Sequence, residues 1–251
     1  MSIDSLHVSV PDDQIHVPKG FVNAGRSQYL VKDEQLGVRW YDITQFPSTL
    51  GMVDATDAPP TEADQDVYIL SGTPHTDWDG ASDGDVVRYD SAFDRWFSSP
   101  PVAGQRAYDT VRTGYWTYGT QWIGEFNVSR AFSSVEILAL YSSPITFISK
   151  LFGTAIIEVD QASVDFVYGT SYATNLILQI INTSADIAHY TSSGVLGTTL
   201  NQHTKFSRES DAPTETQIMA NEDVLVNVAV GNPTAGTGTM TIYATYRIYN
   251  V

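Results

Sequence analysis

The fold is decided by the stretch Thr239-Met-Thr-Ile-Tyr-Ala-Thr-Tyr-Arg-Ile-Tyr249. Its even-numbered residues, from Met240 to Ile248, are apolar or aromatic, and its odd-numbered residues carry hydroxyl, phenol or guanidinium groups. Successive side chains of a strand point to opposite sides, so this alternation predicts a strand with one buried and one solvent face. Such one-sided strands are typical of antiparallel sheets.

Short β-branched and aromatic runs precede this stretch, separated by turn residues such as Gly153, Asp160-Gln161 and Gly169-Thr170. We expect strands over 145–149, 154–159, 163–168, 175–181 and 224–230. Their spacing, roughly 8–12 residues, is typical of a sandwich or jelly roll. No stretch of this half of the chain has a helical spacing of apolar residues as clear as its strand pattern. The chain is therefore predicted to be mostly β, with an antiparallel, jelly-roll-like β-sandwich over residues 125–251.

The N-terminal half has a different composition. All five tryptophans lie before residue 125. Tyr89-Asp90 is followed by Trp96, and Tyr108-Asp109 is followed by Trp116, an internal echo that predicts two hairpins with Asp- and Ser-containing turns. Residues 51–124 are thus expected to form a small Trp/Tyr-rich hairpin module. Residues 1–50 are expected to be an extended attachment arm with a hairpin from Arg26 to Asp42.

Composition excludes several classes of protein. The 251 residues include no cysteine, which rules out disulfides, thiolate metal sites and cysteine nucleophiles. With 29 acidic and 13 basic residues the net charge is −16, which disfavours nucleic acid or an anionic membrane as partner. The longest apolar tract, residues 135–152, is interrupted by Glu136 and Lys150 and is not expected to cross a membrane. The first residues do not have the pattern of a secretory signal.

Several spaced features in the middle of the chain form one recognisable order. They are Pro59-Pro60, Asp66-Val-Tyr68-Ile-Leu70, Trp78-Asp-Gly80, Tyr89-Asp90, Trp96, Pro100-Pro101, Gly104 and the Tyr108-Asp109…Trp116 unit. Together they resemble the short "PP…GD-x-Y-I-V…W-x-G…Y-D…W" module of structural proteins from tailed bacteriophages. The resemblance covers residues 51–124, and Gln65 stands where the family tends to have glycine.

The resemblance implies a non-enzymatic virion protein, assembled in the host cytoplasm. We expect a homotrimeric head or tail fibre or spike that contacts other virion proteins and attaches to the host surface, in one version through a host surface glycan. A capsid decoration protein and a carbohydrate-binding receptor-recognition module are the alternatives, and a glycan hydrolase is a third. Neither nucleic-acid binding nor membrane insertion is expected.

Aromatic residues are the strongest candidates for binding. Five of them crowd within fifteen residues, alternating with Thr, Gly and Gln: Tyr108, Tyr115, Trp116, Tyr118 and Trp122. Exposed rings beside hydroxyl and amide groups suit the faces of sugars. Hairpin aromatics more often pack in a core or at a subunit interface, so the sequence favours packing over glycan binding.

An acidic stretch between residues 77 and 85 is a second candidate. Its carboxylates, Asp77, Asp79, Asp83 and Asp85, stand near glycines, and oxygen-rich loops of this kind can hold Ca²⁺. The EF-hand spacing is absent, and Asp and Gly are also the ordinary residues of turns. A solvated turn is therefore the favoured interpretation, no cofactor is expected, and calcium is kept as an alternative.

Catalytic motifs are not evident in the sequence. Glycoside hydrolysis needs two carboxylates held about 5–9 Å apart, and Glu125, Glu136 and Glu158 stand in strand-like surroundings without a motif. The histidines show neither a triad pattern nor zinc spacing; they are His7, His16, His75, His189 and His203. The chain is accordingly predicted not to be an enzyme.

Overall fold

The computed structural model describes residues 28–33, 37–42, 48–61, 63, 66–91, 93–151, 155–174, 176–183, 190–208 and 221–250. The chain divides into two compact units, residues 1–46 and residues 47–251. In the first unit, β1 (Gln28–Asp33) and β2 (Gly37–Asp42) pair antiparallel. This pair lies within the hairpin expected from Arg26 to Asp42. The expected arm over residues 1–27 lies outside the described residues.

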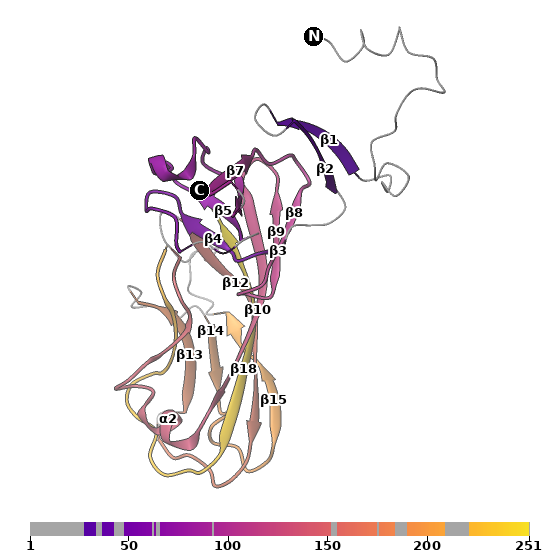
Figure 1. Ribbon diagram of the computed structural model, residues 1–251. Coiled ribbons are helices and arrows are strands. Elements are labelled where there is room, and N and C mark those ends of the chain that lie inside the picture. The colour runs from indigo at the N-terminus through magenta and orange to yellow at the C-terminus, as the bar shows by residue number, and fades with distance from the viewer. Residues whose placement is uncertain are drawn as a thin grey trace, which may run out of the picture. The chain divides into compact units, whose positions relative to one another are not determined.

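A large sheet forms the frame of the second unit. Its strand order is β15-β12-β18-β10-β9-β8-β3. The strands are β3 (Ser48–Thr49), β8 (Arg106–Asp109), β9 (Gly114–Tyr118), β10 (Trp122–Phe132), β12 (Ile156–Val167), β15 (Gln202–Lys205) and β18 (Thr239–Tyr249). Neighbours pair antiparallel except β3 and β8, which are parallel. Figure 1 shows β10 and β18 running side by side through this unit.

A second sheet faces the first. Its order is β11-β17-β13-β14-β16, from β11 (Ile145–Ile148), β17 (Val224–Val228), β13 (Ile177–Asn182), β14 (Tyr190–Ser193) and β16 (Ser207–Arg208). Val164 and Ile242 from the large sheet share one buried cluster with Leu178 and Val226 from this one. Two sheets closed over a common core form a sandwich. The mostly β class with an antiparallel sandwich is confirmed, and the jelly-roll connectivity stays a prediction.

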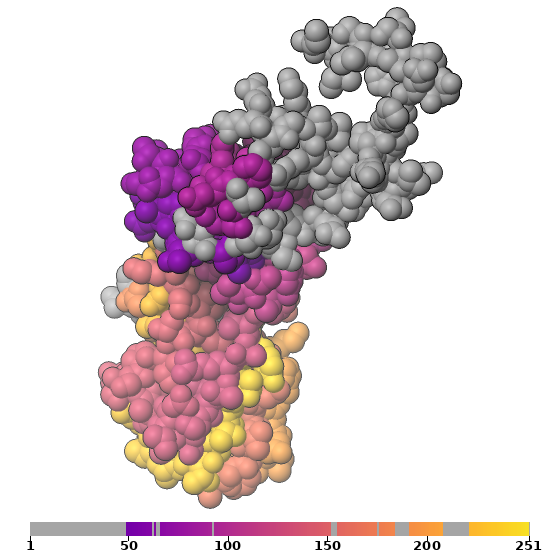
Figure 2. Space-filling model, viewed as in Figure 1, coloured from indigo at the N-terminus to yellow at the C-terminus, as the bar shows by residue number. Residues whose placement is uncertain are grey.

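A third sheet has the order β4-β5-β6-β7 and consists of β4 (Met52–Asp54), β5 (Val67–Ser71), β6 (Val86–Asp90) and β7 (Arg95–Ser99). One face adds Ile69 and Val86 to the main core. The other face builds a separate small core, which consists of Ala55, Tyr68, Leu70, Trp78, Val87, Tyr89 and Trp96. Figure 2 shows the indigo and purple atoms of this part gathered at one end of the unit.

The sandwich differs from the sequence-based expectation in two local features. Strands expected over 154–159 and 163–168 are one strand, β12, because Asp160 is accommodated in a β-bulge between Val159 and Gln161 instead of a turn. A short helix, α2 (Ser134–Ala139), was not expected. Its capping box, in which Ser133 and Glu136 each accept from the other's backbone N–H, was a readable signal. The hydrogen bond from the Ser133 backbone lowers the pKa of Glu136.

Strand β10 crosses residue 124, the expected boundary between the hairpin module and the sandwich. Its first residues pair with β9, with Gly124 opposite Trp116, and its residues from Ile123 to Phe132 pair with β18. A side chain at Gly124 would overlap the ring of Phe126, so this position has no room for a Cβ atom. The second hairpin thus continues the large sheet rather than standing apart from it.

Candidate functional site

The five candidate aromatic residues fall on both faces of the large sheet. Tyr108 and Tyr115 are cross-strand partners on the outer face, with ring centroids 5.0 Å apart. The guanidinium carbon of Arg106 lies 4.2 Å from the centre of the Tyr115 ring, which is 37% exposed. This geometry allows a cation–π contact and leaves the Tyr115 ring accessible at the surface.

Trp116 and Trp122 belong to the main core and are 0% and 1% exposed. The Trp116 indole N–H donates to Asp109 over 3.0 Å, and the Trp122 indole N–H donates to the carbonyl of Gly84 over 2.8 Å. In this fold both rings pack inside the main core and neither reaches the surface. Tyr118 is half-buried against Trp122, with ring centroids 5.3 Å apart.

Asp109 organises the turn between β8 and β9 from a fully buried position. One of its carboxylate oxygens accepts the backbone N–H groups of Val111 and Arg112, and the other accepts from Trp116 and the Arg112 side chain. A buried carboxylate is tolerated only when donors surround it in this way. Asp109 therefore stabilises the hairpin from inside the core.

Three of the four aspartates of the acidic stretch each accept a backbone N–H group. Asp79 accepts the backbone N–H of Trp96, Asp83 accepts that of Gly72, and Asp85 accepts that of Ser82, each over 2.8–2.9 Å. Asp77 is exposed beside His75. Within the described ranges, no group of three or more acidic, His or Cys side chains is placed to hold a metal ion. Asp77, Asp79 and Asp83 are exposed, whereas Asp85 is buried.

The remaining acidic and histidine candidates lie in different surroundings. Glu125 is exposed beside Arg247, Glu136 caps α2, and Glu158 is buried and accepts from the Tyr249 hydroxyl over 2.7 Å. His75 accepts the backbone N–H of Asp77, and His203 pairs with Asp165 across β12 and β15. His7, His16 and His189 lie outside the described residues.

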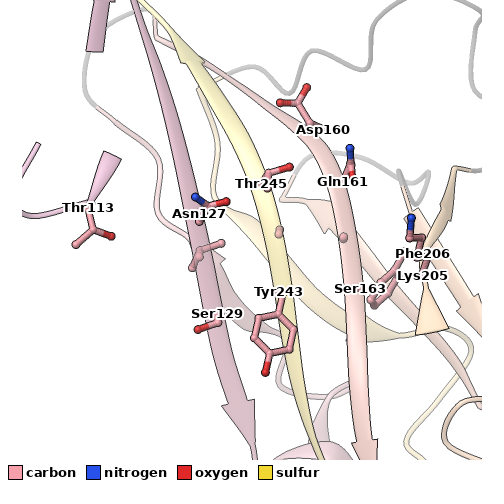
Figure 3. Close-up of a pocket in the computed structure, with 13 residues that line it drawn as sticks. Thr113, Asn127, Ser129, Asp160, Gln161, Ser163, Lys205, Phe206, Tyr243 and Thr245 are labelled. Carbon is pink, nitrogen blue, oxygen red and sulfur yellow. The ribbon is translucent and has the colours of Figure 1, made fainter. Parts of the chain in front are cut away.

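A depression lies on the outer face of the large sheet. It has a volume of about 720 Å³ and crosses β10, β18 and β12, from Thr113 in the β8–β9 turn to Lys205 on β15. Figure 3 shows side chains of these strands lining it. Six of them are neutral and polar: Asn127, Ser129, Gln161, Ser163, Tyr243 and Thr245. This volume lies within the roughly 300–1,000 Å³ range of small-molecule sites. We call this depression the outer-face groove.

Two rows of cross-strand neighbours form the floor of the groove. In the first row, Tyr243 of β18 lies between Ser129 of β10 and Ser163 of β12, and Ser163 is in turn opposite Lys205. In the second row, Thr245 lies between Asn127 and Gln161. The Tyr243 side chain is 42% exposed. The sequence shows the alternation that places these residues outward, but it does not show which strands become neighbours.

A charged cluster borders the groove. The Arg247 Nε atom lies 3.4 Å from a carboxylate oxygen of Glu125 and 3.5 Å from a carboxylate oxygen of Asp160. Asp160, at the β-bulge, also lines the groove. A hydrogen bond with Tyr249, followed by the charge of Asp160, raises the pKa of Arg247 further above its ordinary value. A second depression of about 370 Å³ adjoins the groove here, since the two share Thr113, Asn127, Asp160 and Thr245, and it includes Tyr115 and Arg106.

Comparison with known proteins does not assign the chain. No protein-family model matches it, and no curated protein matches its sequence.

The long apolar tract of the sequence, residues 135–152, contributes the short helix α2 and the strand β11. Among the helices of the described ranges, none is both long and apolar enough for a membrane span.

Proposed function

We propose that this chain is a non-enzymatic structural protein of a tailed-bacteriophage particle, a trimeric head or tail fibre that takes part in attachment to the host surface. One observation carries the proposal. Five residues of the phage-module resemblance gather into a single small core, although they are spread along the sequence: Tyr68, Leu70, Trp78, Tyr89 and Trp96.

The geometry of this core supports treating the motif as one folded unit. The Trp96 ring centroid lies 4.9 Å from that of Trp78, 5.3 Å from that of Tyr89 and 5.7 Å from that of Tyr68. Asp79, the residue after the motif tryptophan Trp78, accepts the backbone N–H of Trp96. The aromatic features of the motif from Tyr68 to Trp96 therefore have a packing reason for their positions, which ordinary turn sequences would not require.

Exposed apolar side chains support self-association. Val102 and Val111 are each 67% exposed, and Leu50 is 40% exposed. Val111 and Leu50 lie near one another, because Thr110 donates its backbone N–H to the Thr49 carbonyl. Aliphatic side chains at an exposed turn and sheet edge suit a contact between identical subunits.

Light scattering coupled to gel filtration of the full chain tests the trimer. We expect a mass of three chains at micromolar concentration, and a shift toward monomer in the Val111→Asp variant. Val135→Asp is the matched control, since Val135 is 74% exposed on α2. A wild-type chain that remains monomeric would remove the trimer from the proposal.

Antibody labelling of intact particles tests the virion role. We expect gold label on tailed particles released by cells that carry the gene. Label on the tail supports a tail fibre, and label spread over the capsid supports a head fibre or decoration protein. Particles without label and without peptides of this chain in mass spectrometry would overturn the proposal.

A further inference from the structure

The outer-face groove combines surface exposure with polar side chains that pair with no residue in the described ranges. Within the described part of the chain, no hydrogen bond or ion pair joins the side chains of Asn127, Ser129, Gln161, Ser163, Tyr243 or Thr245 to another residue. Elsewhere on the surface, comparable groups do pair: Thr170 bonds Thr237, and Thr174 bonds Thr234. The hydrogen-bonding capacity of the groove is therefore available to a ligand.

We propose that the outer-face groove binds a carbohydrate chain laid across strands β10, β18 and β12, with the Tyr243 ring as its stacking platform. This inference rests on the proposed role in host attachment and assigns the ligand class and the site. It places the sugar contact away from Trp116 and Trp122, which the core encloses.

The arrangement of the rows matches the chemistry of sugars. A sugar presents C–H groups on its ring faces and hydroxyl groups around its edge, so it needs an apolar ring flanked by small donors and acceptors. Tyr243 provides the ring, and Ser129 and Ser163 flank it on the neighbouring strands. Asn127 and Gln161 add amides, which both donate and accept, on either side of Thr245.

Charge and polarity argue against other ligand classes. Asp160 lines the groove and Glu125 borders it, in a chain of net charge −16, which disfavours nucleic acid. A lipid or other apolar ligand would bury six polar side chains without giving them hydrogen-bond partners, which is unfavourable. Lys205, at the β15 end, supplies N–H donors for sugar hydroxyl groups.

The test uses the full chain on an array of bacterial surface oligosaccharides, followed by calorimetric titration with the fragment that binds best. We expect Tyr243→Ala to weaken binding at least tenfold, and Asn127→Ala to weaken it severalfold. The matched control is Tyr141→Ala, because Tyr141 is 50% exposed and lies outside the groove. Thermal unfolding of all three variants checks that the fold is intact.

Two results would overturn the inference. One is a native chain that binds no oligosaccharide on the array. The other is a folded Tyr243→Ala variant that binds as well as the native chain. Particle labelling separates these failures from failure of the virion role: a chain found on particles without sugar binding refutes only the groove, whereas sugar binding by a chain absent from particles refutes only the virion role.

Discussion

The two hairpins β6–β7 and β8–β9 share a Tyr-Asp pair before the turn and a tryptophan on the second strand, yet they contribute to different cores. In each, a Tyr-Asp pair ends the first strand and a turn of four residues follows, closed by Asp90 opposite Arg95 or by Asp109 opposite Gly114. The last turn residue has a positive φ in both, 52° at Asp94 and 55° at Thr113. The position of the tryptophan differs by one residue. Trp96 follows the tyrosine of its Tyr-Asp pair by seven residues, whereas Trp116 follows its tyrosine by eight.

That single position moves the tryptophan to the other face. Trp96 lies opposite Tyr89, and both rings enter the small core. Trp116 lies opposite Ala107 and enters the main core, which leaves Tyr108 and Tyr115 outside. Because side chains alternate along a strand, an offset of one residue reverses the face. The comparison shows how a repeated unit can pack on itself in one copy and extend a larger sheet in the next.

The largest difference between the hairpins is expected at Asp109. Asp109→Ala leaves the Arg112 guanidinium and the Trp116 indole without their acceptor, and loss of a partner from such a buried network costs about 3–5 kcal/mol. Asp94→Ala in the first hairpin removes the acceptor of the Tyr89 hydroxyl, at a cost of about 1–2 kcal/mol. Urea unfolding measures both. Equal losses would show that the two turns are held in the same way.

The indole N–H groups provide a finer comparison. Trp116→Phe removes the donor to Asp109 and is expected to cost about 2 kcal/mol. The Trp96 indole N–H is buried and has no hydrogen-bond partner in the described part of the chain. Trp96→Phe removes an unsatisfied donor, so we expect a change within about 1 kcal/mol. A loss at Trp96 as large as that at Trp116 would contradict this difference.

High pH should lower the stability of the main core, to which the second hairpin contributes Trp116. Burial raises the pKa values of Tyr246 and Tyr172, both in the main core, to about 12. The unfolded chain loses these protons near pH 10, so stability is full below pH 10 and falls between pH 10 and pH 12. The expected loss is about 1 kcal/mol per tyrosine at pH 11. Unfolding across this range tests it, and Tyr172→Phe should reduce the slope.

The smallest effect is expected on the outer face. Tyr115→Ala removes the contacts with Arg106 and Tyr108, and we expect a loss of about 1 kcal/mol or less because the ring is partly exposed. Thermal unfolding of this variant is compared with that of Trp116→Ala, in which loss of a buried ring is expected to cost about 3–5 kcal/mol. If the two neighbours cost the same, the assignment of opposite faces is mistaken.

Local patterns made part of this structure predictable. The alternation from Thr239 to Tyr249 predicts β18 and its buried face, and both Tyr-Asp hairpins form as pairs. Pairing between distant segments was not predictable, since nothing local in Ser163 or Tyr243 indicates that they become neighbours. The groove follows from that pairing, so the sequence identified Tyr115 but missed Tyr243. Asp160 lies in a bulge and not in a turn because β18 pairs with β12 on both sides of it, and this pairing is also not visible in the local sequence.

The position of β18 in the sheet has a consequence for how the protein folds. This strand lies between β10 and β12, yet it is synthesised after every other described strand. The centre of the large sheet therefore cannot form until β18 has left the ribosome, and β10 must wait for a partner more than one hundred residues away. Folding is slow in such a topology, because the chain loses the entropy of closing a long loop before the non-local contacts form. During this interval the edges of β10 and β12 that later pair with β18 are exposed, and an exposed strand edge can pair with another chain.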